Sequence, residues 1–366
     1  MNITLNREQL LPALSDLNGV VESRPALAIL ANVLINISPQ EIRLTTTDME
    51  VELSEAIPGE FGEVGEITVP ARKILDICRA LPEAAEIALT VEDERVNVAS
   101  GRSRFSLLSL PAQEFPRVEP GQTDISFSLS QAVFKSLLER TAFAMARQDV
   151  RYYLNGVLLE AEAGRLRAVA TDGHRLALCE VDIAFPTEEK KQLIMPRKGV
   201  MELLRLLHDS EDEVEIVMSG NHIRIVRGDL IFTSKLIDGK YPDYNRVIPA
   251  LAQQPVLAQR ETLKRSLGRA SILSTDKYRG VKITLEADKL SANVHNPEQE
   301  QAEDEIDVEY SGEKLEVGFN VSYLLDAVSI IQTDKVKLSI SSPKSGCLVL
   351  PEEGEECKYI VMPLML

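Results

Sequence analysis

The sequence is poor in the residues that build metal sites and disulfide frameworks. Its 366 residues include only four cysteines and four histidines. The cysteines form no CxxC pair, and no histidine stands at ligand spacing from Cys347 and Cys357. We therefore expect no metal and no cofactor. We also expect all four cysteines to be free, reduced thiols: Cys78, Cys179, Cys347 and Cys357.

A targeting signal and a long apolar run are also missing. The N-terminal segment MNITLNREQL lacks the basic start and the apolar core of a signal peptide. The longest apolar stretch, near Leu27 to Ile37, is interrupted by Asn32 and Asn36 and is too short to cross a bilayer. The sequence therefore predicts a cytoplasmic protein.

The chain lacks the basic excess that nucleic-acid-binding domains usually show. Its formal net charge is −17, and 27% of its residues are charged. The sum alone argues against a nucleic-acid partner. A length of 366 residues is right for two or three domains. In a chain of several domains, how the charge is distributed along the sequence matters more than its total.

One order of elements, a helix, two strands, a second helix and further strands, recurs three times along the chain. Short polar residues suited to turns occupy matching places, because Asp48, Asp172 and Asn296 are 124 residues apart. In each copy the second helix is indicated by apolar residues at helical spacing. These second helices are expected at residues 70–81, 196–207 and 320–331.

A period of 124 residues is too long for a solenoid, so each copy should hold its own core. Polar stretches near 117–124 and 249–255 separate the copies. The sequence therefore predicts an α+β fold of three repeated domains, each with two helices packed on antiparallel sheet. We place them at residues 1–122, 123–250 and 251–366.

The positive charge is concentrated in the expected helices. The six helix segments together carry +7, which leaves −24 for the rest of the chain. A single charged helix face is usually only solvated, but four of the six segments carry at least +2. This distribution favours a shared basic surface inside an acidic protein. An acidic exterior with a sparse basic lining would allow DNA to slide.

The size of a ring lined by these helices fits duplex DNA only for a dimer. Six helices at roughly 10 Å spacing, each about 10 Å thick, enclose a hole of about 9 Å. Twelve helices enclose a hole of about 28 Å, wider than the roughly 20 Å of B-DNA.

Long segments across nearly the whole chain resemble the β-subunit family of bacterial DNA polymerase III. The segments that carry the resemblance are VPARKILDICRALPE, SGRSRFSLLSLPAQEFP, QDVRYYLNG, VATDGHRL, PRKGV, IFTSKLIDGKYPDY, NPEQE, VGFNVSYLLD and YIVMPLML. The resemblance implies a sliding clamp: a head-to-tail homodimer of six domains that encircles DNA without reading its sequence and tethers a polymerase. It also implies partners that bind through short peptides, namely the polymerase α subunit, the clamp-loader δ subunit, translesion and repair polymerases, ligase and mismatch-repair proteins.

The resemblance places a partner cleft between the second and third domains. Its apolar residues would form a pocket for peptide anchors, and Gly173 permits a tight turn. The terminal segment MPLML is equally readable as a last core strand, and both interpretations can hold. The chain departs from the family pattern at Tyr278, where a phenylalanine is usual, and at Met365, where a basic residue is usual. The cleft residues are Leu154, Thr171, Gly173, His174, Arg175, Leu176, Pro242, Arg246, Val247, Tyr278, Asn320, Tyr323, Val361, Met362, Pro363 and Leu364.

The same resemblance implies residues that contact DNA. The two tyrosines of QDVRYY suit phosphates or stacking on a single strand, although tyrosines are as often packed in a core. The family contacts correspond to Arg24, Arg72, Lys73, Gln148, Tyr152, Tyr153, Arg197, Lys198 and Arg205.

A third set of residues would close the dimer. Apolar contacts with rims of opposite charge at the two ends suit a head-to-tail ring. This set comprises Lys73, Arg95, Arg102, Arg104, Phe105, Leu107, Ile272, Leu273, Glu298, Glu300, Glu303 and Asp304.

Two other functions deserve comparison with this one. The segment TDGH (Thr171 to His174) resembles part of a hydrolase or metal site, but no other histidine stands at useful spacing, and copies one and three carry TDME and HNPE there. The segment is therefore interpreted as a structural turn, and no enzyme is expected. A protein scaffold that does not bind DNA is the other alternative. Salt-dependent retention on circular but not linear DNA would distinguish it from a clamp.

Overall fold

The protein, described here from a computed structural model, forms two compact units. The structure describes residues 2–118, 123–184, 190–275, 279–354 and 356–365. Unit 1 comprises Met1–Lys135 and Lys198–Leu236, and unit 2 comprises Ser136–Arg197 and Ile237–Leu366. Each unit takes strands from two sequence repeats and contains one eight-stranded and one four-stranded antiparallel sheet. The borders of the compact units therefore differ from the borders of the repeats, and the three domain ranges given above stay a prediction.

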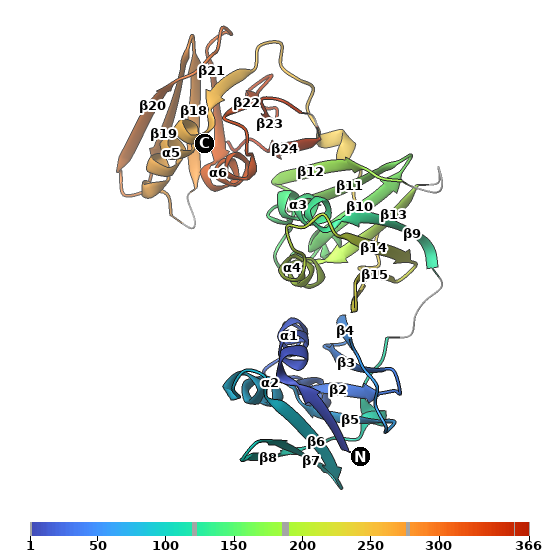
Figure 1. Ribbon diagram of the computed structural model, residues 1–366. Coiled ribbons are helices and arrows are strands. Elements are labelled where there is room, and N and C mark those ends of the chain that lie inside the picture. The colour runs from blue at the N-terminus through green and yellow to red at the C-terminus, as the bar shows by residue number, and fades with distance from the viewer. Residues whose placement is uncertain (1, 119–122, 185–189, 276–278, 355, 366) are drawn as a thin grey trace. The chain divides into compact units, whose positions relative to one another are not determined.

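Two α-helices belong to each repeat, as the apolar spacing predicts. Ile74 and Cys78 of the second helix and Val200 and Leu203 of the fourth are buried, so the predicted faces pack inward. In Figure 1, α1 lies against α2, and α5 lies against α6. None of the helices in the described ranges is long and apolar enough to cross a membrane. The six helices are α1 (Arg7–Leu17), α2 (Ala71–Ala80), α3 (Gln131–Ala142), α4 (Arg197–Leu206), α5 (Arg260–Ala270) and α6 (Val321–Ile330).

Unit 1 contains the strands of the first repeat and, from the second repeat, its first strand and its last three strands. Its eight-stranded sheet has the order β5-β2-β3-β4-β16-β15-β14-β9, and its four-stranded sheet has the order β1-β6-β7-β8. The strands are β1 (Asn2–Asn6), β2 (Asn32–Ile37), β3 (Glu41–Thr47), β4 (Val51–Pro58), β5 (Gly65–Pro70), β6 (Glu86–Glu92), β7 (Arg95–Ser100), β8 (Ser103–Leu108), β9 (Thr123–Ser130), β14 (Glu213–Ser219), β15 (His222–Arg227) and β16 (Leu230–Lys235).

Unit 2 contains the four middle strands of the second repeat and the strands of the third. Its sheets have the orders β13-β10-β11-β12-β24-β23-β22-β17 and β20-β19-β18-β21. The strands are β10 (Gly156–Glu162), β11 (Arg165–Thr171), β12 (Arg175–Asp182), β13 (Lys191–Pro196), β17 (Val256–Gln259), β18 (Gly280–Glu286), β19 (Lys289–His295), β20 (Gln301–Asp307), β21 (Leu315–Asn320), β22 (Lys335–Ser339), β23 (Cys347–Pro351) and β24 (Cys357–Val361).

One antiparallel pair in each unit joins strands of different repeats. In unit 1, β4 pairs with β16, so that Leu53 lies opposite Phe232. In unit 2, β12 pairs with β24, so that Leu176 lies opposite Ile360. All four of these side chains are buried. Backbone hydrogen bonds and a shared core therefore make each eight-stranded sheet continuous across two repeats.

The repeated turn has the same hydrogen bonds in the first two copies. In copy one, the Thr47 hydroxyl donates to the Val51 carbonyl (2.9 Å), and Asp48 Oδ1 accepts from the amides of Glu50 (2.8 Å) and Val51 (2.7 Å). In copy two, Thr171 and Asp172 make the equivalent bonds. Residue three of the turn has positive φ in both, +76° at Met49 and +87° at Gly173. The segment TDGH is therefore a turn that also occurs, with different residues, in copy one.

The expectation of four free thiols is wrong for two of them. Cys179 and Cys357 form a disulfide, while Cys78 and Cys347 are free and buried. The two bonded residues lie directly opposite each other where β12 pairs with β24, with their Cα atoms 4.1 Å apart. Spacing along the sequence gave no sign of this pair, because 178 residues separate the two positions. The bond links the second repeat to the third at the pairing that joins them.

We predict that this disulfide stabilises unit 2 measurably. Closing a loop of 178 residues restricts the unfolded chain, which corresponds to up to about 5 kcal/mol. Cys357→Ser should lower the melting temperature of the oxidised protein by several degrees, to a value that dithiothreitol no longer changes. Cys78→Ser, which removes a buried free thiol, is the control and should leave the response to dithiothreitol intact. Equal melting temperatures with and without reductant in the wild-type protein would contradict the prediction.

Candidate functional site

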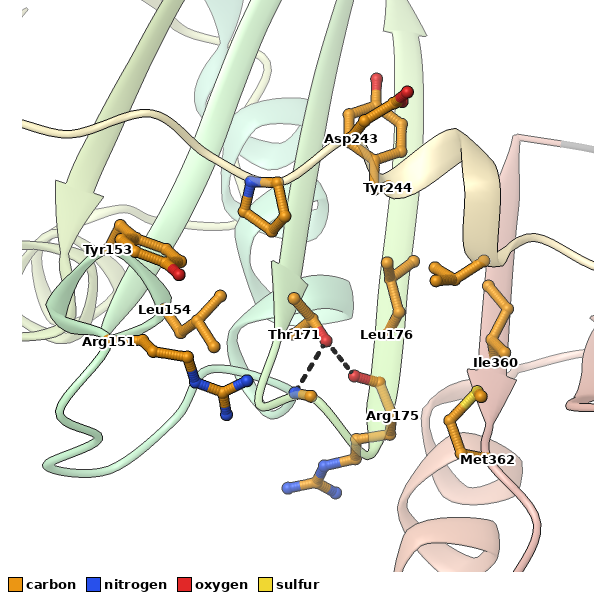
Figure 2. A pocket seen from close by; sticks show the side chains of 13 residues that line it. Arg151, Tyr153, Leu154, Thr171, Arg175, Leu176, Asp243, Tyr244, Ile360 and Met362 are labelled. Carbon is orange, nitrogen blue, oxygen red and sulfur yellow. Dashed lines mark hydrogen bonds between the residues drawn. The ribbon is translucent and has the colours of Figure 1, made fainter.

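An apolar pocket of about 220 Å³ lies in unit 2, beside the pairing of β12 with β24. Figure 2 shows side chains from several segments around it: the end of β11, the start of β12, the segment just before β10, the segment near residue 243 and the end of β24. It is lined by Arg151, Tyr153, Leu154, Thr171, Gly173, Arg175, Leu176, Pro242, Asp243, Tyr244, Val247, Ile360 and Met362.

The turn between β11 and β12 forms one wall of the pocket. The Thr171 hydroxyl donates to the Arg175 carbonyl (2.6 Å) and accepts from the Gly173 amide (3.1 Å), as Figure 2 shows. Gly173 has a φ of +87°, a region that side-chain-bearing residues rarely adopt. Asp172 Oδ1 accepts from the amides of His174 (2.9 Å) and Arg175 (3.0 Å). The turn is fixed by its own side chains before any ligand binds.

Arg175 connects this wall to two helices. Its Nε donates to Asp172 Oδ2 (3.0 Å), and its Nη2 donates to the carbonyl of Phe143, just after α3 (2.8 Å). Its Nη1 bonds to Asp326 of α6, and the guanidinium lies 4.5 Å from the centre of the Tyr323 ring. A guanidinium with this many partners is held in one geometry. Arg175 therefore acts mainly as a structural side chain, and only part of it faces the pocket.

A buried ionic network supports the opposite wall. The Tyr244 hydroxyl donates to Glu160 Oε1 (2.9 Å), and the Glu160 side chain is fully buried. Arg167 Nη1 (3.0 Å), Lys190 Nζ (2.7 Å) and Gln192 Nε2 (2.6 Å) complete the shell of this carboxylate. Burial disfavours its charge, but these hydrogen bonds outweigh burial and lower the pKa of Glu160. Burial and the neighbouring Glu160 raise the pKa of Tyr244 to about 12, so its hydroxyl stays protonated and donates.

The last residues of the chain close the pocket and also extend the sheet. The Met362 amide donates to the His174 carbonyl (2.9 Å), and the Leu364 amide donates to the Gly318 carbonyl (2.8 Å). Ile360 is buried in the core cluster of unit 2, whereas Met362 is partly exposed at the pocket. The interpretation of MPLML as a last core strand is wrong, because β24 ends at Val361 and Met362, Leu364 and Met365 are exposed. Met362 instead lines the pocket, as the second interpretation predicted.

A charged pair lies at the far end of the pocket. Arg151 Nη2 bonds to Asp149 Oδ2 (2.9 Å), and Arg151 also approaches the Asp172 carbonyl (3.4 Å). Hydrogen bonds from the Arg151 side chain and amide lower the pKa of Asp149 to about 2. Arg151 thus gives the apolar pocket a polar edge, and its charge is already paired with Asp149.

The structure brings eight of the predicted cleft residues to the pocket: Leu154, Thr171, Gly173, Arg175, Leu176, Pro242, Val247 and Met362. Others lie close by without lining it. His174 stacks on Tyr323 with ring centres 6.3 Å apart, and Asn320 caps α6 by accepting from the Ser322 amide (3.0 Å). Arg246 is exposed and pairs with Asp243 (2.9 Å). Val361, Pro363 and Leu364 flank the lining residues Ile360 and Met362, and Tyr278 lies outside the described residues.

Five lining residues were missed: Arg151, Tyr153, Asp243, Tyr244 and Ile360. Arg151 and Tyr153 belong to the QDVRYY segment, which had been interpreted as a DNA contact. Tyr153 packs against the core cluster of unit 2 and faces the pocket, while its neighbour Tyr152 is largely exposed. The segment QDVRYY could have indicated either site, because Tyr152 and Tyr153 are adjacent in a 3-10 helix and differ in exposure.

The predicted DNA contacts are distributed over both units. Arg24, Arg72, Lys73, Lys198 and Arg205 belong to unit 1, and Gln148, Tyr152, Tyr153 and Arg197 belong to unit 2. Arg24, Arg72, Lys73, Gln148, Tyr152, Lys198 and Arg205 are exposed. Burial, with the nearby charges of Arg147 and Arg175, lowers the pKa of Arg197. Several of these cations have acidic neighbours, as described below for Lys198.

Several predicted dimer contacts lie on β8 and β20, each of which is the strand at one end of a four-stranded sheet. Arg104, Phe105 and Leu107 belong to β8, while Glu303 and Asp304 belong to β20. Ile272 and Leu273 lie in a 3-10 turn after α5, where the Ile272 side chain is 76% exposed. Leu107 is buried within its own unit, and Leu108, which the prediction omitted, is exposed instead. The remaining residues of this set, which lie on the surface, are Lys73, Arg95, Arg102, Glu298 and Glu300.

In the described part of the chain, no group of three or more histidine, cysteine, aspartate or glutamate side chains could hold a metal ion. The lining of the unit 2 pocket is mainly apolar with a few polar atoms, which suits apolar anchors.

Comparison with known proteins accounts for the whole chain. Residues 1–119, 128–243 and 245–365 match the N-terminal, central and C-terminal domain models of the DNA polymerase III beta subunit. The beta sliding clamp of Escherichia coli K12 is 45% identical, with both chains fully covered. The crystal structure of the DNA polymerase sliding clamp from Pseudomonas aeruginosa with ligand is 48% identical over the full length of both chains, with a TM-score of 0.98. A second Pseudomonas aeruginosa sliding clamp structure, bound to griselimycin, is also 48% identical, covers both chains fully and has a TM-score of 0.96.

We predict that the bond between Tyr244 and Glu160 stabilises the pocket wall. Tyr244→Phe removes one donor from a buried carboxylate, which should lower the free energy of unfolding by about 1.5–3 kcal/mol. Tyr310→Phe is a matched control in the same unit, because its hydroxyl donates to the Glu313 carbonyl (2.8 Å) at the surface. Urea denaturation of both variants measures the difference. Equal losses in the two variants would show that the buried network does not depend on Tyr244.

Proposed function

Because the chain belongs to the family of bacterial DNA polymerase III β subunits, the sliding clamps, we propose that two copies close head to tail around duplex DNA and bind partners through the unit 2 pocket. The family function is established by the match: the chain is a processivity subunit of DNA polymerase III, and the family is not catalytic. DNA and a polymerase are accordingly its general partners. The ring, the contact residues and the individual peptide partners are our proposals.

The pocket is the single observation that carries the tethering role. It is mainly apolar, its walls are fixed by internal hydrogen bonds, and a cationic side chain, Arg151, stands at one end. A preformed apolar pocket with a few polar groups suits two or three anchors of a short peptide. We infer that the peptide carries a glutamine and spaced leucine and phenylalanine residues. A flexible peptide loses entropy on binding, so micromolar affinity is expected.

The partners that would carry such peptides are those implied by the family. They are the polymerase III α subunit, the clamp-loader δ subunit, translesion and repair polymerases, ligase and mismatch-repair proteins. The bound griselimycin of the Pseudomonas aeruginosa relative shows that a clamp of this family binds this compound. We further propose that the protein works in the cytoplasm, where replication proteins meet DNA.

The proposed ring is supported by two strands at the ends of sheets. Among the described strands, β8 and β20 each pair on one side only within their sheets. The β8 end carries Arg102 and Arg104, and β20 carries Glu303, Asp304, Glu305 and Asp307. An unpaired strand edge offers backbone donors and acceptors to another chain. Opposite charges favour pairing of β8 in one copy with β20 in a second copy, which is a head-to-tail contact.

We predict that the apolar residues of the 3-10 turn after α5 hold the dimer together. Replacing Ile272 and Leu273 by alanine would remove side chains worth about 2–5 kcal/mol each when buried in an interface. The double variant should sediment as a folded monomer at micromolar concentration. Val64→Ala, which truncates another exposed apolar side chain, is the control and should remain dimeric. A double variant that stays fully dimeric would place the interface elsewhere.

We also predict that the C-terminal residues are required for peptide binding. Deleting residues 362–366 removes Met362 from the pocket and should abolish binding of a fluorescent anchor peptide while leaving the dimer intact. Met362→Ala should weaken binding by about tenfold, since it removes one apolar anchor contact.

The matched control is Met365→Ala, because Met365 is fully exposed and does not line the pocket. Fluorescence anisotropy measures the affinities, and sedimentation measures the dimer in parallel. Unchanged peptide affinity in a folded, truncated dimer would show that the peptide binds at another place.

A further inference from the structure

The ammonium group of Lys198 lies between two carboxylates of the first repeat. Lys198 is the second residue of α4, and its Nζ is 3.0 Å from Glu22 Oε1 and also pairs with Asp48 Oδ2. All three residues belong to unit 1. The Asp48 side chain is only 1% exposed, whereas Lys198 and Glu22 are 42% and 45% exposed. One carboxylate is therefore fixed in the protein, and the other lies at the surface with the amine.

Asp48 is held in place independently of Lys198. Its Oδ1 accepts from the amides of Glu50 and Val51 in the repeated turn, which leaves Oδ2 to face the ammonium. A buried carboxylate without a counter-charge is costly, so this arrangement favours a cation at this place. Burial opposes the charge of Lys198, but the bonds from Asp48 and Glu22 outweigh it and raise the pKa of the amine. The side chain is thus both charged and already paired.

The other proposed DNA-contacting cations of unit 1 are not all paired with a carboxylate. Arg205 is also paired, since its Nη2 bonds to Glu202 Oε1 (2.6 Å) within α4. Arg24 and Lys73 are exposed and have no ion pair among the residues that the structure describes. The cations of the proposed DNA surface therefore fall into a free class and an internally neutralised class. A phosphate that approaches a cation of the second class competes with a protein carboxylate that already neutralises it.

We propose that Glu22 and Asp48 are built-in counter-anions of Lys198, which compete with DNA phosphates for its ammonium group and keep the affinity of the clamp for DNA low. The inference rests on the proposed function, because it assumes that Lys198 faces DNA. When a phosphate displaces a carboxylate, one ion pair replaces another, and the net gain is small. Low affinity at each contact reduces the cost of leaving it, as movement along DNA requires.

The exchange has a signature in the salt dependence of binding. A contact between a free cation and a phosphate releases a counterion from DNA and contributes about −0.9 to the slope of log K against log salt concentration. In the wild-type protein, the carboxylates set free from Lys198 take up a cation, so this contact contributes close to zero. Removing the carboxylate charges should restore the full contribution.

The experiment measures binding of the intact dimer to a fluorescent duplex oligonucleotide at several potassium chloride concentrations. Three variants are compared with the wild type: Glu22→Gln, Asp48→Asn and the double variant. Asparagine at position 48 keeps the Oδ1 acceptor of the turn. The double variant should bind roughly twofold to fivefold more tightly, as expected of one exposed ion pair. Its slope should be steeper by about 0.9 for each Lys198 that contacts a phosphate.

Two controls separate local competition from a general change of charge. Glu215→Gln removes one negative charge from an exposed position of β14 and should give a smaller gain and an unchanged slope. Adding Lys198→Ala to the double variant should abolish both the gain and the steeper slope. Melting temperatures verify that each variant is folded. If Asp48→Asn does not fold, Glu22→Gln alone tests the proposal, because it changes only a half-exposed side chain.

The possible results distinguish this inference from the proposed function. If the wild-type dimer shows no salt-dependent association with duplex DNA, the DNA-encircling function itself is wrong. If the wild type binds but the neutral variants match Glu215→Gln in affinity and slope, only the counter-anion proposal is overturned. A gain in DNA affinity that remains after Lys198→Ala is added to the double variant also overturns the counter-anion proposal, because the effect would then not depend on the Lys198 amine.

Discussion

Pairing between strands of different repeats is the constraint on which the rest of each unit depends. The repeats are separated in sequence, but β4 hydrogen-bonds to β16 and β12 to β24, so each eight-stranded sheet is completed by a neighbouring repeat. In unit 2 this pairing brings Leu176 opposite Ile360 and sets Met362 beside the turn at Gly173. The pocket exists only because these two strands are in that register. A shift by one residue would turn Ile360 away from the core.

The repeated aspartate turn shows how one structural element serves two purposes. In both copies, Oδ1 of the aspartate accepts two turn amides, and Oδ2 is left to bind a cation. Asp48 directs Oδ2 to Lys198 of α4, and Asp172 directs it to Arg175, which in turn bonds to Asp326 of α6. In each unit the turn is thereby connected to the second helix of the next repeat. The first connection leaves a cation partly exposed, while the second nearly buries it beneath a pocket.

Periodicity predicted the helices and turns well, because both depend on residues close in sequence. The faces of α2, α4 and α6 and the turn at Asp172 follow directly from local spacing. The disulfide between Cys179 and Cys357 was missed because it depends on the register of strands 178 residues apart.

The site was predicted in outline, and the missing parts have a common cause. Resemblance supplied the turn, Pro242 and Met362, but Tyr244 enters the pocket wall through a bond to a buried carboxylate on β10. Likewise, the positive charge counted in α4 includes Lys198 and Arg205, which acidic residues already neutralise. Charge counts treat each cation as free, whereas only the three-dimensional arrangement shows its partners.

The two proposed binding surfaces, the pocket of unit 2 for peptides and the basic surface for DNA, place opposite demands on the side chains around them. A peptide pocket gains affinity from rigidity, because fixed walls cost no further ordering when the ligand binds. The network around Glu160 and the turn at Thr171 supply that rigidity from within unit 2. A surface on which DNA moves gains nothing from tight local contacts, since each must be broken at every step. If Lys198 faces DNA as proposed, its pairs with Glu22 and Asp48 keep the cation charged and in place and leave little net energy for any one phosphate. The proposed binding of partners at one pocket and the proposed weak, delocalised binding of DNA can thus coexist in a chain with a net charge of −17.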